Sequence, residues 1–191
     1  MDGLFVHESA NFEDGVNFGK NCKIWHYAHV RTNATLGNNV IVGKSSFIDV
    51  NVKIGNNVKI QNLVSIYNGV TIGNDVFIGP HVVFTNDLYP RSVGDWSITP
   101  TFVDDGVSIG ANSTIICGNN IGANSLIAAG SVVTKNIPPH ALIAGNPGRL
   151  LGWVCRCARK VADNTLKEGS HSITCDHCKT INDFDVLPLT K

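Results

Sequence analysis

The chain has 191 residues, which is enough for one domain with a real core and a small appendage but not for two full domains. Fifteen Lys and Arg residues balance fifteen Asp and Glu residues, so the composition gives no indication of nucleic acid or an anionic membrane as the main partner. No apolar run reaches the roughly 18 residues that span a bilayer, and the first residues have neither the basic nor the apolar segment of a secretory signal. We therefore expect a cytoplasmic protein without membrane insertion.

The first 84 residues carry an apolar side chain at every sixth position. Only 43% of the chain is apolar, so an unbroken run of this length has a chance of roughly one in a hundred thousand and is a fold signal. A small or branched residue stands four places after most of these positions, and Gly often follows directly, as in "LGNN" and "IGND". The apolar positions are Val6, Phe12, Phe18, Ile24, Val30, Leu36, Val42, Ile48, Ile54, Ile60, Ile66, Ile72, Ile78 and Phe84.

A strict period of six fits neither the 3.6-residue period of a helix nor simple alternating strands. It predicts an all-β, prism-shaped coil in which each hexad supplies one short strand and one corner. The Asn and Gly residues at the expected corners tolerate positive φ at low cost. We expect the aliphatic side chains to stack on their equivalents one coil away.

The period stops at Phe84 and resumes at Val103, nineteen residues later, so the frame has slipped by one. The intervening segment 85–102 contains two Pro residues and several polar side chains, which predicts a loop projecting from the coil wall. It could merely decorate the surface, but its length and its stiffening by Pro favour a functional loop. The period then continues to Val133.

The pattern aliphatic-Gly-x-x-small-x closely resembles the hexapeptide-repeat acyltransferases over about residues 6–147. The resemblance implies a left-handed parallel β-helix with three hexads per coil, a homotrimer, and active sites between neighbouring prisms that the loops help to enclose. We therefore expect a β-helix acetyltransferase domain over residues 1–152, with the loop 85–102 projecting from it. The cysteines of residues 153–191 indicate a small separate segment. The same repeats also build non-catalytic and carbonic-anhydrase-like solenoids, for which His26, His29 and His81 could supply metal ligands between subunits.

The stretches "QNLVSIYNGV" and "FTNDLYPR" resemble more narrowly the N-acetyltransferases of nucleotide-linked 3-amino sugars. That resemblance implies a reacting region beside Asn86, with His81 as a second catalytic candidate. A side-chain base is dispensable when an amine loses its own proton to solvent. The alternatives are a turn-stabilising role for Asn86 and an exposed wall position for His81.

Polar side chains of neighbouring coils can line one groove for the sugar nucleotide, and arginines can pair with its diphosphate. Several of these residues could equally be solvated or pack against a trimer neighbour. The substrate-binding candidates are Trp25, His26, Arg31, Gln61, Asn62, Tyr67, Asn68, Tyr89 and Arg91.

The resemblance places acetyl-coenzyme A near the last coils. The small residues Ala128, Ala129 and Gly130 would permit close approach, and Lys135 is a candidate phosphate partner. The "AGNPGR" segment matches the family's terminal turn, with Gly replacing the usual Ala, and makes Arg149 a second phosphate candidate.

The tail contains two close cysteine pairs, Cys155 with Cys157 and Cys175 with Cys178. In a cytosolic chain such pairs predict a structural zinc site rather than disulfides, because four thiolates complete a tetrahedral shell. His171 or His177 could replace one cysteine.

The resemblance implies an acetyl-coenzyme A-dependent N-acetyltransferase in bacterial surface-glycan synthesis, such as that of lipopolysaccharide O-antigen. The first expectation for the acceptor is a UDP-2-acetamido-3-amino-2,3-dideoxyuronic acid. The second is a dTDP-3-amino-3,6-dideoxyhexose.

Overall fold

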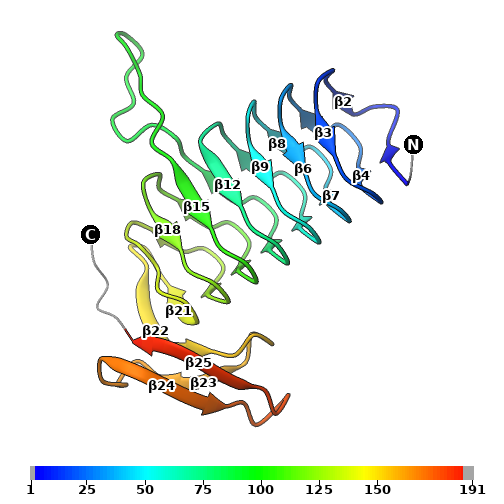
Figure 1. Ribbon diagram of the computed structural model, residues 1–191. Helices are drawn as coiled ribbons and strands as arrows, with labels where there is room; N and C mark the ends of the chain where they lie inside the picture. Colours follow the sequence, from blue (N-terminus) through cyan, green and yellow to red (C-terminus); the bar gives the residue numbers. More distant parts are fainter. Residues whose placement is uncertain (1–2, 187–191) are drawn as a thin grey trace.

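The computed structural model of the chain describes residues 3–186, which form strands and turns. None of these residues belongs to a helix long and apolar enough to cross a membrane. Three sheets of short parallel strands make up the walls of one prism-shaped solenoid, and two hairpins follow at its C-terminal end (Figure 1). The all-β, parallel coil predicted from the period of six is confirmed.

Up to β20 each sheet takes every third strand, because one coil passes through all three walls. The first sheet contains β1 (Phe5–Val6), β4 (Lys23–Ile24), β7 (Ile41–Val42), β10 (Lys59–Ile60), β13 (Phe77–Ile78), β16 (Ser108–Ile109), β19 (Leu126–Ile127) and β21 (Ala141–Ala144). The second contains β2 (Asn11–Phe12), β5 (His29–Val30), β8 (Phe47–Ile48), β11 (Ser65–Ile66), β14 (Val83–Phe84), β17 (Thr114–Ile115) and β20 (Val132–Val133). The third contains β3 (Asn17–Phe18), β6 (Thr35–Leu36), β9 (Lys53–Ile54), β12 (Val70–Ile72), β15 (Thr101–Val103) and β18 (Asn120–Ile121).

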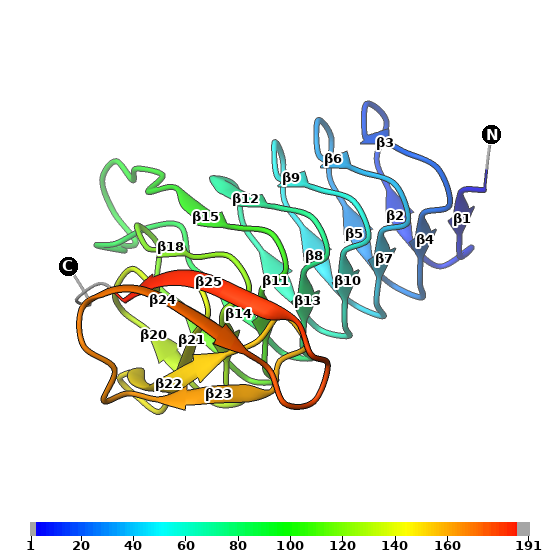
Figure 2. The same cartoon turned by 60° about the horizontal axis from the view of Figure 1, so that its bottom comes forward.

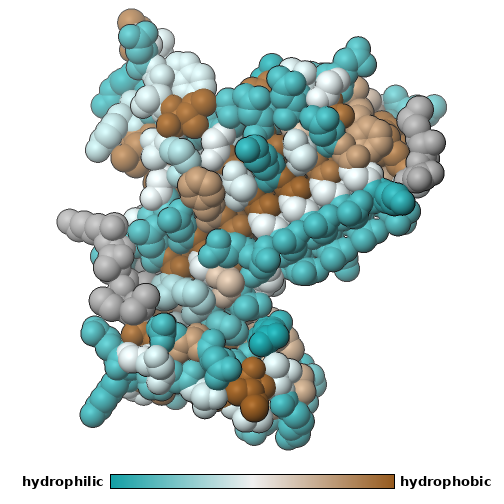
Figure 3. Space-filling view, in the orientation of Figure 1, coloured by the Kyte–Doolittle hydropathy of each residue, from teal (hydrophilic) through white to brown (hydrophobic). Residues whose placement is uncertain are grey.

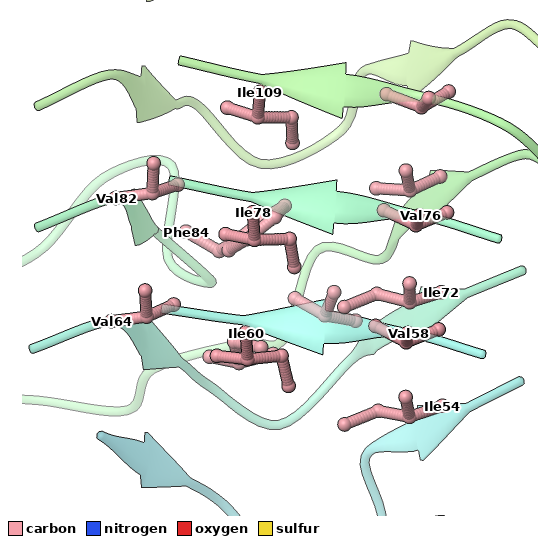
Figure 4. Close-up of a cluster of buried hydrophobic side chains, with 14 of the residues drawn as sticks. Ile54, Val58, Ile60, Val64, Ile72, Val76, Ile78, Val82, Phe84 and Ile109 are labelled. Atoms are coloured by element: carbon pink, nitrogen blue, oxygen red, sulfur yellow. The ribbon is translucent and has the colours of Figure 1, made fainter. Parts of the chain in front are cut away.

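The core is a set of apolar columns along the solenoid axis. Lys59 pairs with Ile41 on one side and with Phe77 on the other, so successive partners are eighteen residues, or three hexads, apart. Every sixth aliphatic residue therefore points inward onto its equivalent in the next coil, and Ile60 and Ile78 are completely buried (Figure 4). Cys22 occupies one of the small inward places and is also buried, as predicted.

The corners hold the coils at close spacing. Most corners contain a residue with φ near +60°, usually Asn, such as Asn39 and Asn57. A Cβ added to Gly37 would lie 2.6 Å from the main-chain oxygen of Gly55, so a side chain does not fit between these two corners. Side chains also join the coils, since the amide oxygen of Asn56 accepts a hydrogen bond from the main-chain N–H of Asn38 at 2.8 Å. Figure 3 shows an apolar stripe along the solenoid between rows of hydrophilic side chains.

The predicted loop projects between β14 and β15, but it is two residues shorter than expected. Thr71 pairs with Phe102, thirty-one residues further along, whereas the usual separation is eighteen, so thirteen residues are inserted. The loop ends at Pro100, because Thr101 is fully buried at the small inward place of the next hexad and Phe102 already belongs to β15. Thr takes this place since its side chain is small and branched.

The tail extends the first sheet and then turns back. Strand β22 (Arg149–Val154) runs antiparallel to β21 and is followed by β23 (Lys160–Asp163). The second hairpin, β24 (Gly169–Thr174) and β25 (Ile181–Val186), forms a separate two-stranded sheet. Figure 2 shows this hairpin beside β22 and β23 at the end of the solenoid.

Candidate active site

The candidate residues of the solenoid lie along the two edges of the second sheet. We call the turns that precede its strands the first corner and the turns that follow them the second corner. The first corner carries Trp25, His26, Gln61, Asn62, His81, Ala128, Ala129 and Gly130. The second corner carries Arg31, Tyr67, Asn68, Asn86 and Lys135, and the projecting loop begins there. The fold therefore collects residues far apart in the sequence on one wall of the prism.

The two catalytic candidates flank the same strand, β14. His81 precedes it, has φ of 60° and is exposed. Asn86 follows it and is half-buried, and its main-chain oxygen accepts a hydrogen bond from Thr99 N–H that closes the base of the loop. The carboxylate of Asp87 makes the local turn instead, by accepting from Tyr89 N–H at 2.9 Å. The amide of Asn86 thus stands at the foot of the loop beside the sheet.

The acceptor candidates beside β11 lie one coil away from this pair, at a strand spacing of about 4.8 Å. Tyr67 is 38% exposed, and its ring lies 5.7 Å from that of Phe47. Asn62 links two neighbouring coils, since its amide oxygen accepts a hydrogen bond from Lys44 N–H. Gln61 is half-buried at the same corner. Of the loop candidates, Tyr89 is 80% exposed, and Arg91 donates to the neighbouring Pro90 carbonyl.

A ladder of charged side chains that the sequence reasoning missed runs along the second corner. The carboxylate of Glu13 accepts from His29 Nε2 at 2.7 Å and from Thr32 N–H at 2.8 Å. Arg31 Nη1 donates to Asp49 at 2.8 Å, and Arg31 Nε lies 3.6 Å from Glu13. The hydrogen bond from Thr32 N–H, followed by that from His29, lowers the pKa of Glu13. The guanidinium of Arg31, predicted to meet a diphosphate, is therefore already paired with two carboxylates.

The carboxylate of Asp49 is the buried centre of this ladder. Asp49 is only 9% exposed, and it also accepts from the main-chain N–H groups of Val50 and Asn68. Glu13, Arg31, Asp49 and Tyr67 are each eighteen residues apart, and each follows an apolar residue of the six-residue period. That spacing was the signal from which the ladder could have been predicted.

The cofactor candidates lie two coils beyond Asn86. Ala128, Ala129 and Gly130 precede β20 and Lys135 follows it. The turn before Arg149 folds against the same strand, because Val132 N–H donates to Gly145 O and Gly148 N–H donates to Val132 O. Two strand spacings are about 10 Å, so this end of the wall and Asn86 can contact different parts of one extended ligand.

The aromatic candidates near the N-terminus are more distant. Trp25 and His26 lie three coils from Asn86, or about 14 Å at the usual strand spacing. They pack among their own neighbours, with the His7 and His26 rings stacked at 3.5 Å and the Phe5 and Trp25 rings at 5.3 Å. His26 and His29 are equally far from His81, so these three histidines do not meet within one chain.

A shallow hollow of about 410 Å³ lies over β12 and β15, lined by Thr71, Phe102 and Asp105 among others, on the third sheet. Its position does not coincide with the candidates, and we assign it no part in the chemistry. A flat wall with a projecting loop needs a second surface to form a cleft.

In the tail, the four predicted metal ligands come together. The sulfur atoms of Cys155, Cys157, Cys175 and Cys178 all lie within 4.8 Å of one another. His171 Nε2 is hydrogen-bonded to the Lys167 carbonyl, and His177 lies outside the group of four. The cluster contains the four cysteines without a histidine.

Comparison with known proteins places these features in context. Over 61 residues the chain is 51% identical to dTDP-3-amino-3,6-dideoxy-alpha-D-galactopyranose 3-N-acetyltransferase from Aneurinibacillus thermoaerophilus. The matched segment covers 32% of this chain and 32% of the relative. It is 47% identical over 55 residues to 2,3,4,5-tetrahydropyridine-2,6-dicarboxylate N-acetyltransferase from Alkaliphilus metalliredigens, or 29% of this chain and 23% of the relative. The matched segments thus span about a third or less of these relatives.

Solved structures share the fold at low sequence identity. The acetyltransferase domain of PglB from Neisseria gonorrhoeae matches with a TM-score of 0.56 and 21% identity, over 78% of this chain and 57% of that one. PerB from Caulobacter crescentus, solved with CoA and GDP-perosamine, matches with a TM-score of 0.51 and 18% identity, over 79% of this chain and 58% of that one. Such identities support the fold alone.

The family models agree with the repeat seen in the structure. The bacterial transferase hexapeptide model matches residues 15–49 and 51–86. The hexapeptide repeat of succinyl-transferase matches residues 33–68 and 100–135, and so resumes beyond the loop. Together they cover more than half of the chain. The chain therefore belongs to the bacterial hexapeptide-repeat transferase family and folds as a left-handed β-helix.

Proposed function

We propose that the protein is an N-acetyltransferase that transfers the acetyl group of acetyl-coenzyme A to a nucleotide-linked 3-amino sugar. The observation that carries the proposal is the order of the candidates along one wall. Asn86 and the loop stand between the acceptor candidates beside β11 and the cofactor candidates beside β20. One extended donor and one extended acceptor could meet at the foot of the loop.

The acceptor is a UDP-2-acetamido-3-amino-2,3-dideoxyuronic acid or a dTDP-3-amino-3,6-dideoxyhexose. The second class is favoured by a specific observation, since the relative that is 51% identical over 61 residues bears the name of a dTDP-3-amino-sugar 3-N-acetyltransferase. Both acceptors carry a primary amine on C3 of a sugar whose C1 bears the charged nucleoside diphosphate. The same wall would serve both.

The reaction forms a C–N bond from the acceptor amine to the thioester carbonyl carbon and breaks the C–S bond. The amine loses one proton to solvent before attack, and the departing thiolate takes the second. What this chain supplies is position: the amide of Asn86 can hold the amine or the carbonyl oxygen by a hydrogen bond. His81, exposed across β14, is the candidate for proton transfer.

The active assembly is a homotrimer in which the loop of one subunit covers the open wall of the next. Tyr89, Val93 and Trp96 are 80%, 85% and 61% exposed in the single chain, so the loop carries apolar surface that a neighbour would bury. Sedimentation at micromolar concentration tests this assembly. A monomer with full activity would refute it.

The proposal also includes a zinc ion on the four cysteines of the tail, outside the reaction site, and a cytoplasmic place in bacterial surface-glycan synthesis such as that of lipopolysaccharide O-antigen. Acetyl-coenzyme A and nucleotide sugars are cytoplasmic metabolites by their chemistry, being charged and unable to cross a bilayer unaided. Cell fractionation tests the location.

The central experiment incubates the protein with acetyl-coenzyme A and a panel of UDP-linked and dTDP-linked amino sugars, with the amino group at C2, C3 or C4. Mass spectrometry detects the acetylated product, and a thiol reagent detects released coenzyme A. We expect turnover of a 3-amino sugar and little of its 2- and 4-amino isomers. Failure of the folded trimer to acetylate any member would refute the proposed function.

A further inference from the structure

The two cysteine turns of the tail share one backbone design. In the first, Ala158 N–H donates to Cys155 O and Cys155 N–H donates to Arg159 O, at 2.7 and 2.8 Å. In the second, Lys179 N–H donates to Cys175 O and Cys175 N–H donates to Thr180 O, both at 2.9 Å. Ala158 and Lys179 have φ of 65° and 60°. Each turn thus presents two sulfur atoms from one short reverse turn.

The sulfur spacings fit a metal shell rather than bonded pairs. Cys155 and Cys178 have their Sγ atoms 3.4 Å apart, and those of Cys157 and Cys175 are 3.7 Å apart. Four sulfurs at about 2.3 Å from a tetrahedral zinc ion are separated by about 3.8 Å, whereas a disulfide needs about 2.05 Å. All four thiols are free in this structure. Because four thiolates leave no open position, the site is structural and not catalytic.

The second hairpin is not joined to the first by strand pairing. Strand β24 pairs only with β25 among the described strands, and an isolated two-stranded ribbon is at best marginally stable. A hydrogen bond from Arg156 N–H to the Asn182 amide oxygen, at 3.3 Å, joins it to the first cysteine turn. The sulfur cluster supplies a second link beside the packing of β25, since each hairpin provides two of its four sulfur atoms.

The hairpin lies against the last coil through one aromatic side chain. Phe184 of β25 is 7% exposed and stacks on both His140 and Trp153, with ring centroids 5.1 Å apart in each case. Trp153 is fully buried. His140 belongs to the final turn of the solenoid, and its main-chain oxygen accepts from Val154 N–H at 2.7 Å. Phe184 thereby covers the end of the hydrophobic core.

We propose that a zinc ion bound by Cys155, Cys157, Cys175 and Cys178 holds the hairpin of β24 and β25 as a cap on the last coil. The inference rests on the zinc site included in the proposed function and adds what the ion does. Zinc replaces the thiol protons, so binding releases up to four protons and joins the two hairpins through metal–sulfur bonds. Without the ion, Phe184 leaves Trp153 and the end of the core becomes accessible.

The test uses the full chain with Trp25→Phe and Trp96→Phe, which leaves Trp153 as the reporter among three tryptophans. Elemental analysis should find about one zinc per chain, and Co²⁺ in its place should give the visible spectrum of a tetrahedral tetrathiolate site. Removal of zinc with a chelator under reducing conditions should shift Trp153 emission to the red and open the tail to protease. Added zinc should reverse both changes.

Three variants separate the outcomes. Cys175→Ser with Cys178→Ser should lose zinc and show the open tail, while Cys117→Ala, which removes a buried thiol outside the cluster, should keep both zinc and cap. Phe184→Ala should keep zinc yet expose Trp153, because it alters the cap and not the ligands. Absence of zinc and of Co²⁺ binding would refute the metal site and the cap together. Zinc that leaves without any change in Trp153 emission or proteolysis would refute the cap alone, and neither result bears on acetyl transfer.

Discussion

The loop between β14 and β15 can be excised without breaking the hexad. Deleting residues 88–100 would leave Phe84 and Val103 six positions apart, both still pointing inward. Asn86 and Asp87 would form an ordinary corner, and Asp tolerates the positive φ that its place requires. Thr101 is already buried at the small inward position. The shortened chain should therefore close into a regular solenoid.

The expected change in stability is small because two effects oppose each other. Closing a corner of about three residues instead of a loop of about sixteen saves about 1.5 kcal/mol of chain entropy. The deletion removes Ile98, which is 41% exposed and packs over Gly69, at a cost of about 1–2 kcal/mol. The melting temperature should stay within about 5 °C of the parent.

Acetyl transfer should nevertheless fall at least about a hundredfold in kcat/KM, since misplaced reactants lose that much or more. Sedimentation should show a weakened trimer, because Tyr89 and Trp96 are removed. A control that replaces residues 88–98 with Gly and Ser at equal length separates loop length from side chains and should be equally inactive. A folded deletion variant with parental kcat/KM would refute the role given to the loop.

Three further changes test the wall and the last turn of the solenoid. Asn86→Ala should lower kcat by about tenfold or more without changing the melting temperature, as measured by steady-state kinetics and calorimetry. An unchanged kcat would show that Asn86 has only a structural role. Asp49→Ala should cost about 2–3 kcal/mol in urea unfolding, because the variant loses the buried partner of Arg31, and a cost below 0.5 kcal/mol would contradict the ladder. Burial, with the charge of Arg156, lowers the pKa of His140 below 6.5, so the unfolded chain binds a proton that the native chain does not. Stability should fall as the pH drops below about 6.5, and His140→Gln should reduce that slope in unfolding experiments at pH 7.5 and 5.5.

The fold could be predicted because each six-residue repeat by itself determines one strand and one corner. An inward aliphatic residue at every sixth place sets strand, corner and coil together, so the one-residue slip at Val103 marked the loop correctly. The predicted loop ended two residues too late because Thr101 is a polar residue and was therefore assigned to the loop. In the structure Thr101 is fully buried, since its side chain is small enough for the inward position that Val or Ala fills in other hexads. Side-chain volume, and not hydropathy, determines which residue fits there.

The candidate site was only partly predictable because its residues act across coils. Asn62 is a substrate-binding candidate, and its amide oxygen also accepts from Lys44 N–H, a bond between residues eighteen positions apart. The same separation joins Arg31 to Asp49. Both pairs follow from the period once side chains are compared at steps of eighteen rather than six.

The separation of eighteen residues between successive coils also limits which residues can contact the same ligand. Each coil adds about 4.8 Å along the axis, so the place of a residue in its coil fixes its height on the wall. His26 and Ala129 lie five coils apart, about 24 Å, and cannot both touch a transferred acetyl group. Asn86 lies between them, at the foot of the loop, where ligands entering from either end of the wall would meet. Height along the solenoid therefore makes Asn86 and the loop, rather than the aromatic and histidine-rich corner at Trp25, the place to look for the chemistry.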